Sequence, residues 1–174
     1  MKKIFLIIFL SLSLSTILSI ETPIKSNSEE MFQSSTSSIT NKIFQRMKYS
    51  WQEPAPVNIK NIRYITLNHW GFDGKIHVGE IIIHKLVADE VVEIFEELFE
   101  AMFPIERMKL VDDYQGSDDK SILANNCYAL CVRYVAETNR WSKHAFGLAI
   151  DINPQQNHFY FPHRFCSTNR SIWA

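Results

Sequence analysis

Apolar and polar residues alternate along two neighbouring stretches of the chain, residues 62–70 (IRYITLNHW) and 75–84 (KIHVGEIIIH). Alternation combined with β-branched and aromatic residues is typical of strands. The residues between them, 71–74 (GFDG), contain Asp73 and Gly74, a pair that favours a tight hairpin turn. The pattern therefore predicts two antiparallel strands joined by a short turn.

The apolar spacing then changes to that of a helix. In residues 86–103, apolar side chains recur every three or four positions, Asp89 and Glu90 stand near the start, and Pro104 lies just beyond the end. Acidic residues in the first turn and a proline after the last turn both agree with a helix. The apolar positions are Val91, Val92, Phe95, Leu98, Phe99 and Met102. We predict one amphipathic helix over this stretch.

The second half of the chain contains three further apolar stretches. We predict strands at residues 108–114, 127–135 and 146–153, with a polar loop at 115–121 and a turn at 136–140. In the last of these strands, alternation would place Asp151 on the face opposite the apolar side chains. Strands grouped around one long helix predict an α+β domain, with a small, mostly antiparallel sheet and flanking helices.

The N-terminus has the layout of an export signal. Lys2 and Lys3 precede an apolar run that ends at Ile20, which predicts a secretory signal peptide at residues 1–19. Because the run approaches the ~20 residues of a spanning helix, an uncleaved signal anchor is the alternative. Residues 20–44 are polar and rich in Ser and Thr, which favours a flexible leader before a domain at 45–174. We expect an exported protein, periplasmic or extracellular.

Composition narrows the classes of partner. Apolar residues make up 46% of the chain and aromatic residues 13%, as expected of one globular domain. Eighteen basic and nineteen acidic residues give a net charge of −1, so the charge predicts no nucleic-acid partner and no membrane partner beyond the signal anchor. Cys127, Cys131 and Cys166 allow at most one internal disulfide, and we expect the first two to be independent thiols.

The stretch WSKHAFGLAIDINP, residues 141–154, carries the candidate chemistry. An imidazole nitrogen of His144 and a carboxylate oxygen of Asp151 are both good zinc ligands, and Gly147 would let the backbone bend between them. A catalytic zinc normally has three protein ligands, so two residues leave an alternative open. In that alternative, Asp151 pairs locally and His144 is a surface residue.

Five positions of this stretch also carry a resemblance. Ser142, His144, Gly147, Ala149 and Asp151 form the pattern S-x-H-x-x-G-x-A-x-D. It resembles the signature of the D-alanyl-D-alanine carboxypeptidase-like zinc metallopeptidases, which include L-alanyl-D-glutamate endopeptidases acting on peptidoglycan. The similarity extends over roughly residues 45–160, and implies a carboxypeptidase-like (hedgehog-type) core.

The resemblance implies roles for individual residues. His144 and Asp151 would bind Zn²⁺, and Ser142 would support the substrate or the first ligand. Arg133 matches a family arginine that would bind a substrate carboxylate or stabilise an oxyanion; a solvated arginine on an exposed strand is the alternative. The amides of Asn125 and Asn126, which also match the family pattern, would order their loop.

The C-terminal residues depart from the family pattern. Residues 152–174 contain no Asp or Glu, whereas the family places a proton-transferring glutamate and a third zinc-binding histidine there. His158 and His163 are the histidines that follow Asp151, and the catalytic carboxylate stays unassigned. We therefore expect a shortened member that lacks the last part of the core.

Two functions, and a third outcome without function, follow from these residues. The first is a zinc-dependent peptidase of peptidoglycan peptides, of D,D-carboxypeptidase or L-Ala-D-Glu endopeptidase type. The alternative is a catalytically inactive, truncated relative that binds zinc or a cell-wall peptide. The third is a remnant that folds poorly.

Overall fold

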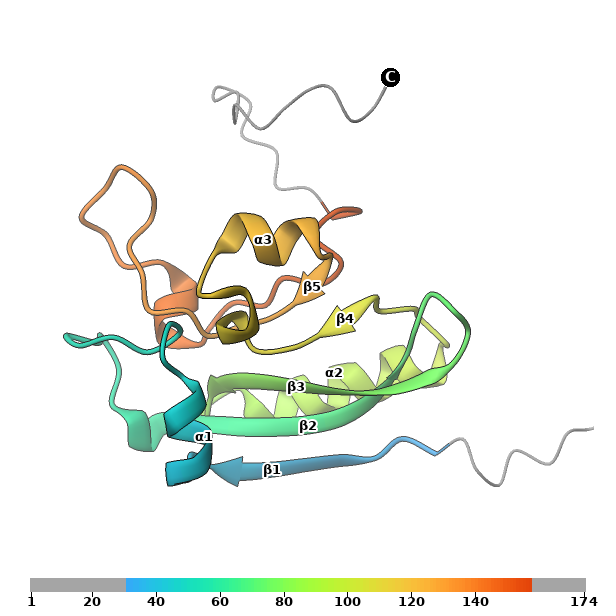
Figure 1. The fold of residues 1–174 in the computed structure, drawn as a ribbon. Coiled ribbons are helices and arrows are strands. Elements are labelled where there is room, and N and C mark those ends of the chain that lie inside the picture. The colour runs from blue at the N-terminus through green and yellow to red at the C-terminus, as the bar shows by residue number, and fades with distance from the viewer. Residues whose placement is uncertain (1–30, 158–174) are drawn as a thin grey trace, which may run out of the picture.

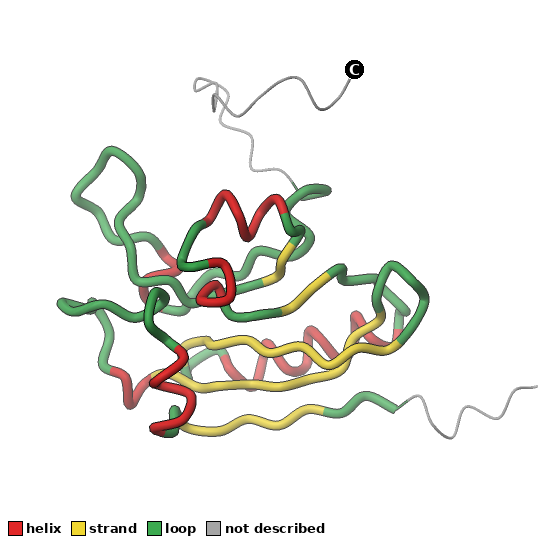
Figure 2. Tube along the Cα trace, in the orientation of Figure 1, coloured by secondary structure: helices red, strands yellow, loops and turns green. Residues whose placement is uncertain are grey.

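A computed structural model of the protein describes residues 31–157 (Figures 1 and 2). It contains a three-stranded sheet in the order β1-β2-β3, a two-stranded sheet of β4 and β5, and several short helices. The elements in chain order are β1 (Ser34–Ser38), α1 (Asn41–Arg46), the 3-10 helix η1 (Ile59–Asn61), β2 (Ile62–Trp70), β3 (Ile76–His84), α2 (Ala88–Glu100), β4 (Arg107–Met108), the 3-10 helix η2 (Val111–Tyr114), α3 (Asp118–Leu123), β5 (Asn126–Cys127) and the 3-10 helix η3 (Lys143–Phe146). An α+β fold with a small antiparallel sheet is thus confirmed.

The predicted hairpin is formed by β2 and β3. The two strands pair antiparallel along their whole length, from Ile62 opposite His84 to Trp70 opposite Ile76. At the turn, the Gly71 N–H donates to the Lys75 carbonyl over 2.7 Å, and Gly74 has a φ of +69°. A positive φ suits glycine because it has no Cβ, so the turn prediction is confirmed.

Residues 34–44 form part of the fold, and the prediction of a flexible leader is wrong for them. All of β1 pairs antiparallel with β2, although its five side chains are exposed. The strand is anchored by the buried Asn68 amide, which bonds the Met31 carbonyl (2.9 Å) and the Gln33 N–H (2.7 Å). Strand pairing uses backbone groups that polar composition does not reveal. The predicted signal peptide lies outside the described residues.

Helix α2 covers one face of the hairpin, as Figure 1 shows. Alternate hairpin residues such as Ile65 and Ile81 pack with Val91 and Phe95 of α2 in the main core cluster. Residues of the opposite parity, such as Ile82, belong to a second cluster. That cluster consists of Met47, Trp51, Ile62, Ile82, Leu110, Leu130 and Val132. Both faces of the hairpin are therefore buried, and the predicted helix is confirmed.

The second half contains far less regular structure than the sequence predicts. Instead of a strand at 108–114, only Arg107–Met108 pair, in parallel, with Asn126–Cys127. The predicted polar loop contains helix α3, and the predicted strand at 146–153 begins in η3 and keeps a single bridge, Asp151 with Tyr128. The turn at 136–140 is confirmed by a bond from the Val135 N–H to the Arg140 carbonyl (2.8 Å).

The stretch 127–135 is buried over residues 127–132 but is not a continuous strand, because its backbone donors bond to different segments. The N–H groups of Tyr128, Leu130, Cys131 and Val132 donate to the carbonyls of Asp151, Ile82, His144 and Ser50. The apolar pattern thus reports burial, while the hydrogen bonds go to four separate parts of the chain. Cys127 and Cys131 are buried free thiols, as expected, and Cys166 lies outside the described residues.

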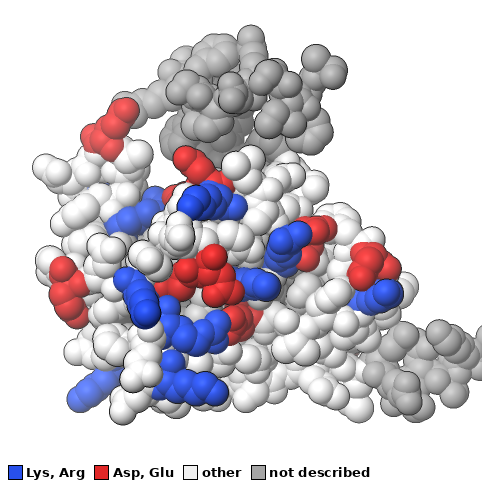
Figure 3. Space-filling view, in the orientation of Figure 1, with Lys and Arg blue, Asp and Glu red and all other residues white. Residues whose placement is uncertain are grey.

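No helix among residues 31–157 combines the length and the apolar character needed to cross a membrane. On the face shown in Figure 3, acidic and basic side chains are interspersed.

Candidate functional site

The short helix η3 carries His144 between two end positions that fix its shape. At its start, the buried Ser142 hydroxyl accepts a hydrogen bond from the His144 N–H over 3.3 Å. At its end, Gly147 has a φ of +65°, and its carbonyl accepts from the His84 N–H at the end of β3 (2.9 Å). A Cβ on Gly147 would lie 2.8 Å from the His84 nitrogen. Only glycine fits this conformation and this close approach, so the loop is held tightly against β3.

The His144 ring is oriented by a backbone carbonyl. Its Nδ1 lies 2.7 Å from the Ala129 oxygen, and a carbonyl only accepts, so Nδ1 carries a hydrogen. The opposite nitrogen, Nε2, faces the Asp151 Oδ2 at 3.5 Å. The His144 side chain is 12% exposed and that of Asp151 is 37% exposed. The structure therefore brings together the two residues that the motif selects.

Tyr128 holds Asp151 beside His144. It pairs with Asp151 through the backbone, and its ring packs on the imidazole of His144. The Asp151 N–H donates to the Tyr128 carbonyl (3.0 Å), and the Tyr128 N–H donates to the Asp151 carbonyl (3.3 Å). The Tyr128 ring stacks on the imidazole, with 5.2 Å between the ring centroids and 21° between the planes. One residue thus fixes the carboxylate on one side and the imidazole on the other.

The spacing of the two side chains suits a shared metal ion. Because Nδ1 carries the hydrogen, Nε2 is the ring nitrogen of His144 that is left to bind a metal. Zinc binds imidazole nitrogen and carboxylate oxygen at about 2.0–2.2 Å, so two corners of a tetrahedral site lie about 3.3–3.6 Å apart. The 3.5 Å separation fits that spacing.

The Ala129 carbonyl that orients His144 corresponds to the hydrogen-bond acceptor that supports a metal-binding histidine in zinc sites. A metal-binding histidine usually donates its second ring N–H to a carbonyl or carboxylate, which fixes the tautomer. Ala129 fills this role. Within residues 31–157, no cluster of three or more His, Cys, Asp and Glu side chains is placed to hold a metal ion. His144 and Asp151 are therefore the two candidate ligands among the described residues, and His158 and His163 lie outside them.

Arg133 is linked to Tyr128 through Asp118, and it does not lie on a solvated strand. Its guanidinium forms an ion pair with the Asp118 Oδ2, and the other oxygen of Asp118 accepts a 2.6 Å hydrogen bond from the Tyr128 hydroxyl. Burial raises the pKa of Tyr128, and the neighbouring Asp118 carboxylate raises it further. The hydroxyl therefore keeps its proton and remains a donor. Sequence reasoning missed both Asp118 and Tyr128.

The two matched asparagines anchor the segments around the site. The amide of the fully buried Asn126 bonds the Lys109 N–H (2.9 Å), the Lys109 carbonyl (3.0 Å) and the Ser121 hydroxyl (3.1 Å). The Asn125 side-chain oxygen accepts from the Gln155 N–H (3.0 Å). These bonds hold β4, α3 and the residues after Asp151 to one another.

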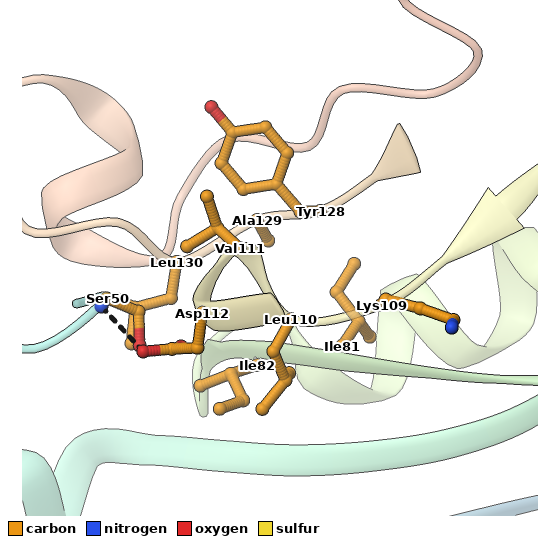
Figure 4. A pocket seen from close by; sticks show the side chains of 10 residues that line it. All are labelled: Ser50, Ile81, Ile82, Lys109, Leu110, Val111, Asp112, Tyr128, Ala129 and Leu130. Carbon is orange, nitrogen blue, oxygen red and sulfur yellow. Dashed lines mark hydrogen bonds between the residues drawn. The ribbon is translucent and has the colours of Figure 1, made fainter. Parts of the chain in front are cut away.

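A small pocket is lined by side chains that include Tyr128 and Ala129 (Figure 4). Its volume of about 10 Å³ suits roughly one water molecule. The buried Ser50 hydroxyl and the Asp112 Oδ2 at this pocket have no hydrogen-bond partner, whereas the Asp112 Oδ1 accepts from the Tyr49 and Ser50 N–H groups. Neither His144 nor Asp151 lines this pocket.

Comparison with known proteins supports the peptidase resemblance. Residues 136–174 match a family model described as D-alanyl-D-alanine carboxypeptidase. The matched range contains Ser142, His144, Gly147 and Asp151, the residues whose geometry is described above. The match supports this peptidase family and does not identify a particular member. Neither a curated protein nor a solved structure matches the chain.

Proposed function

We propose that the protein is a zinc-dependent peptidase acting on peptidoglycan peptides, of D,D-carboxypeptidase or L-Ala-D-Glu endopeptidase type. The observation that carries this proposal is the His144–Asp151 pair, in which Nε2 and Oδ2 face each other at 3.5 Å while Nδ1 bonds the Ala129 carbonyl. The family match over residues 136–174 supports the class of reaction. The proposal includes a carboxypeptidase-like (hedgehog-type) core.

His144 and Asp151 would hold the metal, and Ser142 would keep the His144 loop in place through its hydroxyl. When bound, Zn²⁺ would lower the pKa of its water to about 7 and polarise the scissile carbonyl. Arg133 would bind a substrate carboxylate, because a guanidinium presents several donors in a planar fork. The Tyr128 ring would exclude water from one side of the imidazole.

A second candidate function is binding of zinc or a cell-wall peptide without turnover. It is favoured by one specific observation: within residues 31–157, no group of three or more His, Cys, Asp and Glu side chains is placed to hold a metal ion, whereas a catalytic zinc normally has three protein ligands. Both functions use the same His144–Asp151 pair and the same Arg133. They differ only in whether a peptide bond is broken.

The proposed substrate places the protein outside the cytoplasm. The expected signal peptide at residues 1–19 would bring it to the compartment that contains peptidoglycan. In agreement with a peptide partner rather than a nucleic acid, the basic residues lie among acidic ones on the face shown in Figure 3.

Zinc content per purified chain tests the proposal. We expect about one zinc in the wild type, and loss of that zinc in His144→Ala and in Asp151→Ala. His77→Ala is the matched control, because His77 is half-exposed on the hairpin, where it pairs with Asp73 rather than with Asp151. A folded wild type without zinc, or a His144→Ala variant that keeps its zinc, would contradict the proposal.

Two further measurements separate the two candidate functions. Zinc content of His158→Ala and His163→Ala would show whether either histidine is a third ligand. Release of D-alanine from D-alanyl-D-alanine peptides, or cleavage of L-alanyl-D-glutamate peptides, distinguishes a peptidase from a binding protein that holds the same zinc.

A further inference from the structure

Helix α3 places one carboxylate between the metal-binding region and Arg133. The helix begins with Asp118 directly after Ser117, whose hydroxyl accepts from the Lys120 N–H over 3.3 Å. One turn further on, the fully buried Ser121 hydroxyl bonds the Asn126 amide, which ties α3 to the β4–β5 pair. The position of Asp118 is therefore set by two side-chain contacts of its own helix.

The two oxygens of Asp118 serve two different partners. Oδ1 accepts the hydrogen bond of the Tyr128 hydroxyl, and Oδ2 pairs with the Arg133 Nη2. Since the Tyr128 ring stacks on His144, Asp118 determines both the rotation of Tyr128 and the direction of the Arg133 guanidinium. Neither contact was predicted from the sequence, where Asp118 stands in an ordinary polar stretch.

Arg133 keeps hydrogen-bonding capacity after it pairs with Asp118. A guanidinium has five N–H donors, and Asp118 engages it at Nη2. The Nε atom is buried and lies out of reach of a ligand, while a third of the side-chain surface is exposed. Asp118 thus holds the guanidinium while part of the side chain stays open to a ligand.

From these contacts, we infer that Asp118 is a positioning residue that orients Arg133 to bind a free carboxylate of the substrate. The inference rests on the proposed function and adds to it the residue that sets the direction of Arg133. Holding the fork in its binding orientation before the ligand arrives lowers the entropic cost of binding. Asp118 would act through Arg133, the residue with which it forms the ion pair.

The test compares a carboxylate ligand with its uncharged analogue. The full-length chain, treated with a chelator to prevent turnover, is titrated with D-alanyl-D-alanine and with D-alanyl-D-alaninamide, and binding is followed by NMR. We expect the wild type to bind the carboxylate form about tenfold more tightly, and Asp118→Asn to lose this preference. Asp118→Glu keeps the charge and should recover part of it. Asp119→Asn, which alters the exposed neighbouring residue, should keep all of it.

A double-mutant cycle separates positioning from a merely structural role. If Asp118 acts through Arg133, then Asp118→Asn causes no further loss of the carboxylate preference in an Arg133→Gln background. Additive losses would overturn the inference, as would an Asp118→Asn variant that retains or increases the preference. Circular dichroism establishes that each variant is folded. If Asp118→Asn fails to fold, the test uses Asp118→Glu instead. A folded Asp118→Glu variant that has lost the preference for the carboxylate ligand would also overturn the inference.

The result is distinguishable from failure of the proposed function. Asp118→Asn should bind as much zinc as the wild type, because His144 and Asp151 are unchanged. A wild type that binds no zinc but prefers the carboxylate ligand would contradict the peptidase proposal and leave the role of Asp118 intact. A wild type that binds zinc without any carboxylate preference would overturn the role of Asp118 alone.

Discussion

The hairpin with helix α2 and the site-bearing segment, residues 104–157, are built on different principles. In the first region, nine residues of β2 pair in register with nine of β3, and one thirteen-residue helix covers them. In the second region the strands are two residues long and the longest helix has six residues. The first region is held by a regular ladder and apolar packing. The second region contributes residues such as Met108 and Leu130 to the same apolar clusters, and it adds many individual polar contacts.

The polar contacts of the second region are mostly between side chains and backbone. Asp112, Asn126, Ser142 and Asn153 each bond backbone groups of a neighbouring segment or turn. A buried backbone group that loses such a partner is left unsatisfied, which is costly. The geometry of His144 and Asp151 therefore depends on specific polar side chains, and apolar packing alone would not maintain it.

The largest effect is expected in the core of the first region. Phe95→Ala removes a buried ring between α2 and the hairpin and should lower the free energy of unfolding by about 3–5 kcal/mol. Urea denaturation measures this loss. If the protein binds zinc as proposed, the folded fraction should keep it, because neither His144 nor Asp151 belongs to this core cluster. Loss of zinc at full folding would show that the two regions are not separate.

A smaller effect is expected at the contact between η3 and β3. Gly147→Ala combines the left-handed conformation with a clash against the His84 backbone, which together should cost about 2–4 kcal/mol. Gly74→Ala is the matched control, since Gly74 has nearly the same φ but open space around it, and should cost only about 1–2 kcal/mol. Equal losses of stability in the two variants would mean that the close approach to β3 is unimportant.

Removing one amide tests the polar anchoring of the second region directly. Asn126→Ala leaves the Lys109 N–H and carbonyl without their partners and should cost about 2–3 kcal/mol. Asn139→Ala, at an exposed position, should change stability by less than about 0.5 kcal/mol. Thermal or urea unfolding distinguishes them. If the two variants are equally stable, the proposed difference between the regions is wrong.

The smallest effect concerns pH and belongs to the first region. Burial lowers the pKa of His69, and burial followed by the nearby Lys85 and Arg63 charges lowers that of His84. As pH falls below about 6.5, these histidines bind protons in the unfolded chain but stay unprotonated in the folded one. The free energy of unfolding should therefore decrease between pH 7 and pH 5. The lowered pKa values of Asp73 and Glu80 matter only below about pH 4.5.

Urea midpoints at pH 7 and pH 5 measure this slope. His69→Gln should reduce the decrease in stability, because the variant has no imidazole to protonate at that position. His77→Gln, on the exposed cross-strand neighbour of His69, should leave most of the decrease in place. A wild-type stability that is unchanged between the two pH values would contradict the interpretation of both buried histidines.

The two regions also differ in how well the sequence predicts them. The hairpin and α2 have apolar periods of two and of three to four residues, and both were predicted within a few residues of their ends. Strand β1 was missed because its five residues are polar and exposed, and only its backbone pairs. Helix α3 was missed because its six residues, beginning with two aspartates, read as a loop. The strand prediction at 127–135 was wrong because buried, extended backbone need not join a sheet.

The chain itself specifies the chemistry of the site, since the residue types and spacing of the motif at 142–151 are local properties. It also specifies the hairpin and the long helix, because their apolar periods follow directly from backbone geometry. The direction of the His144 imidazole was decided by Ala129, fifteen residues earlier, and that of Arg133 by Asp118, also fifteen residues earlier. Such contacts form only when several segments pack together, because no local pattern records which distant carbonyl or carboxylate a side chain will meet.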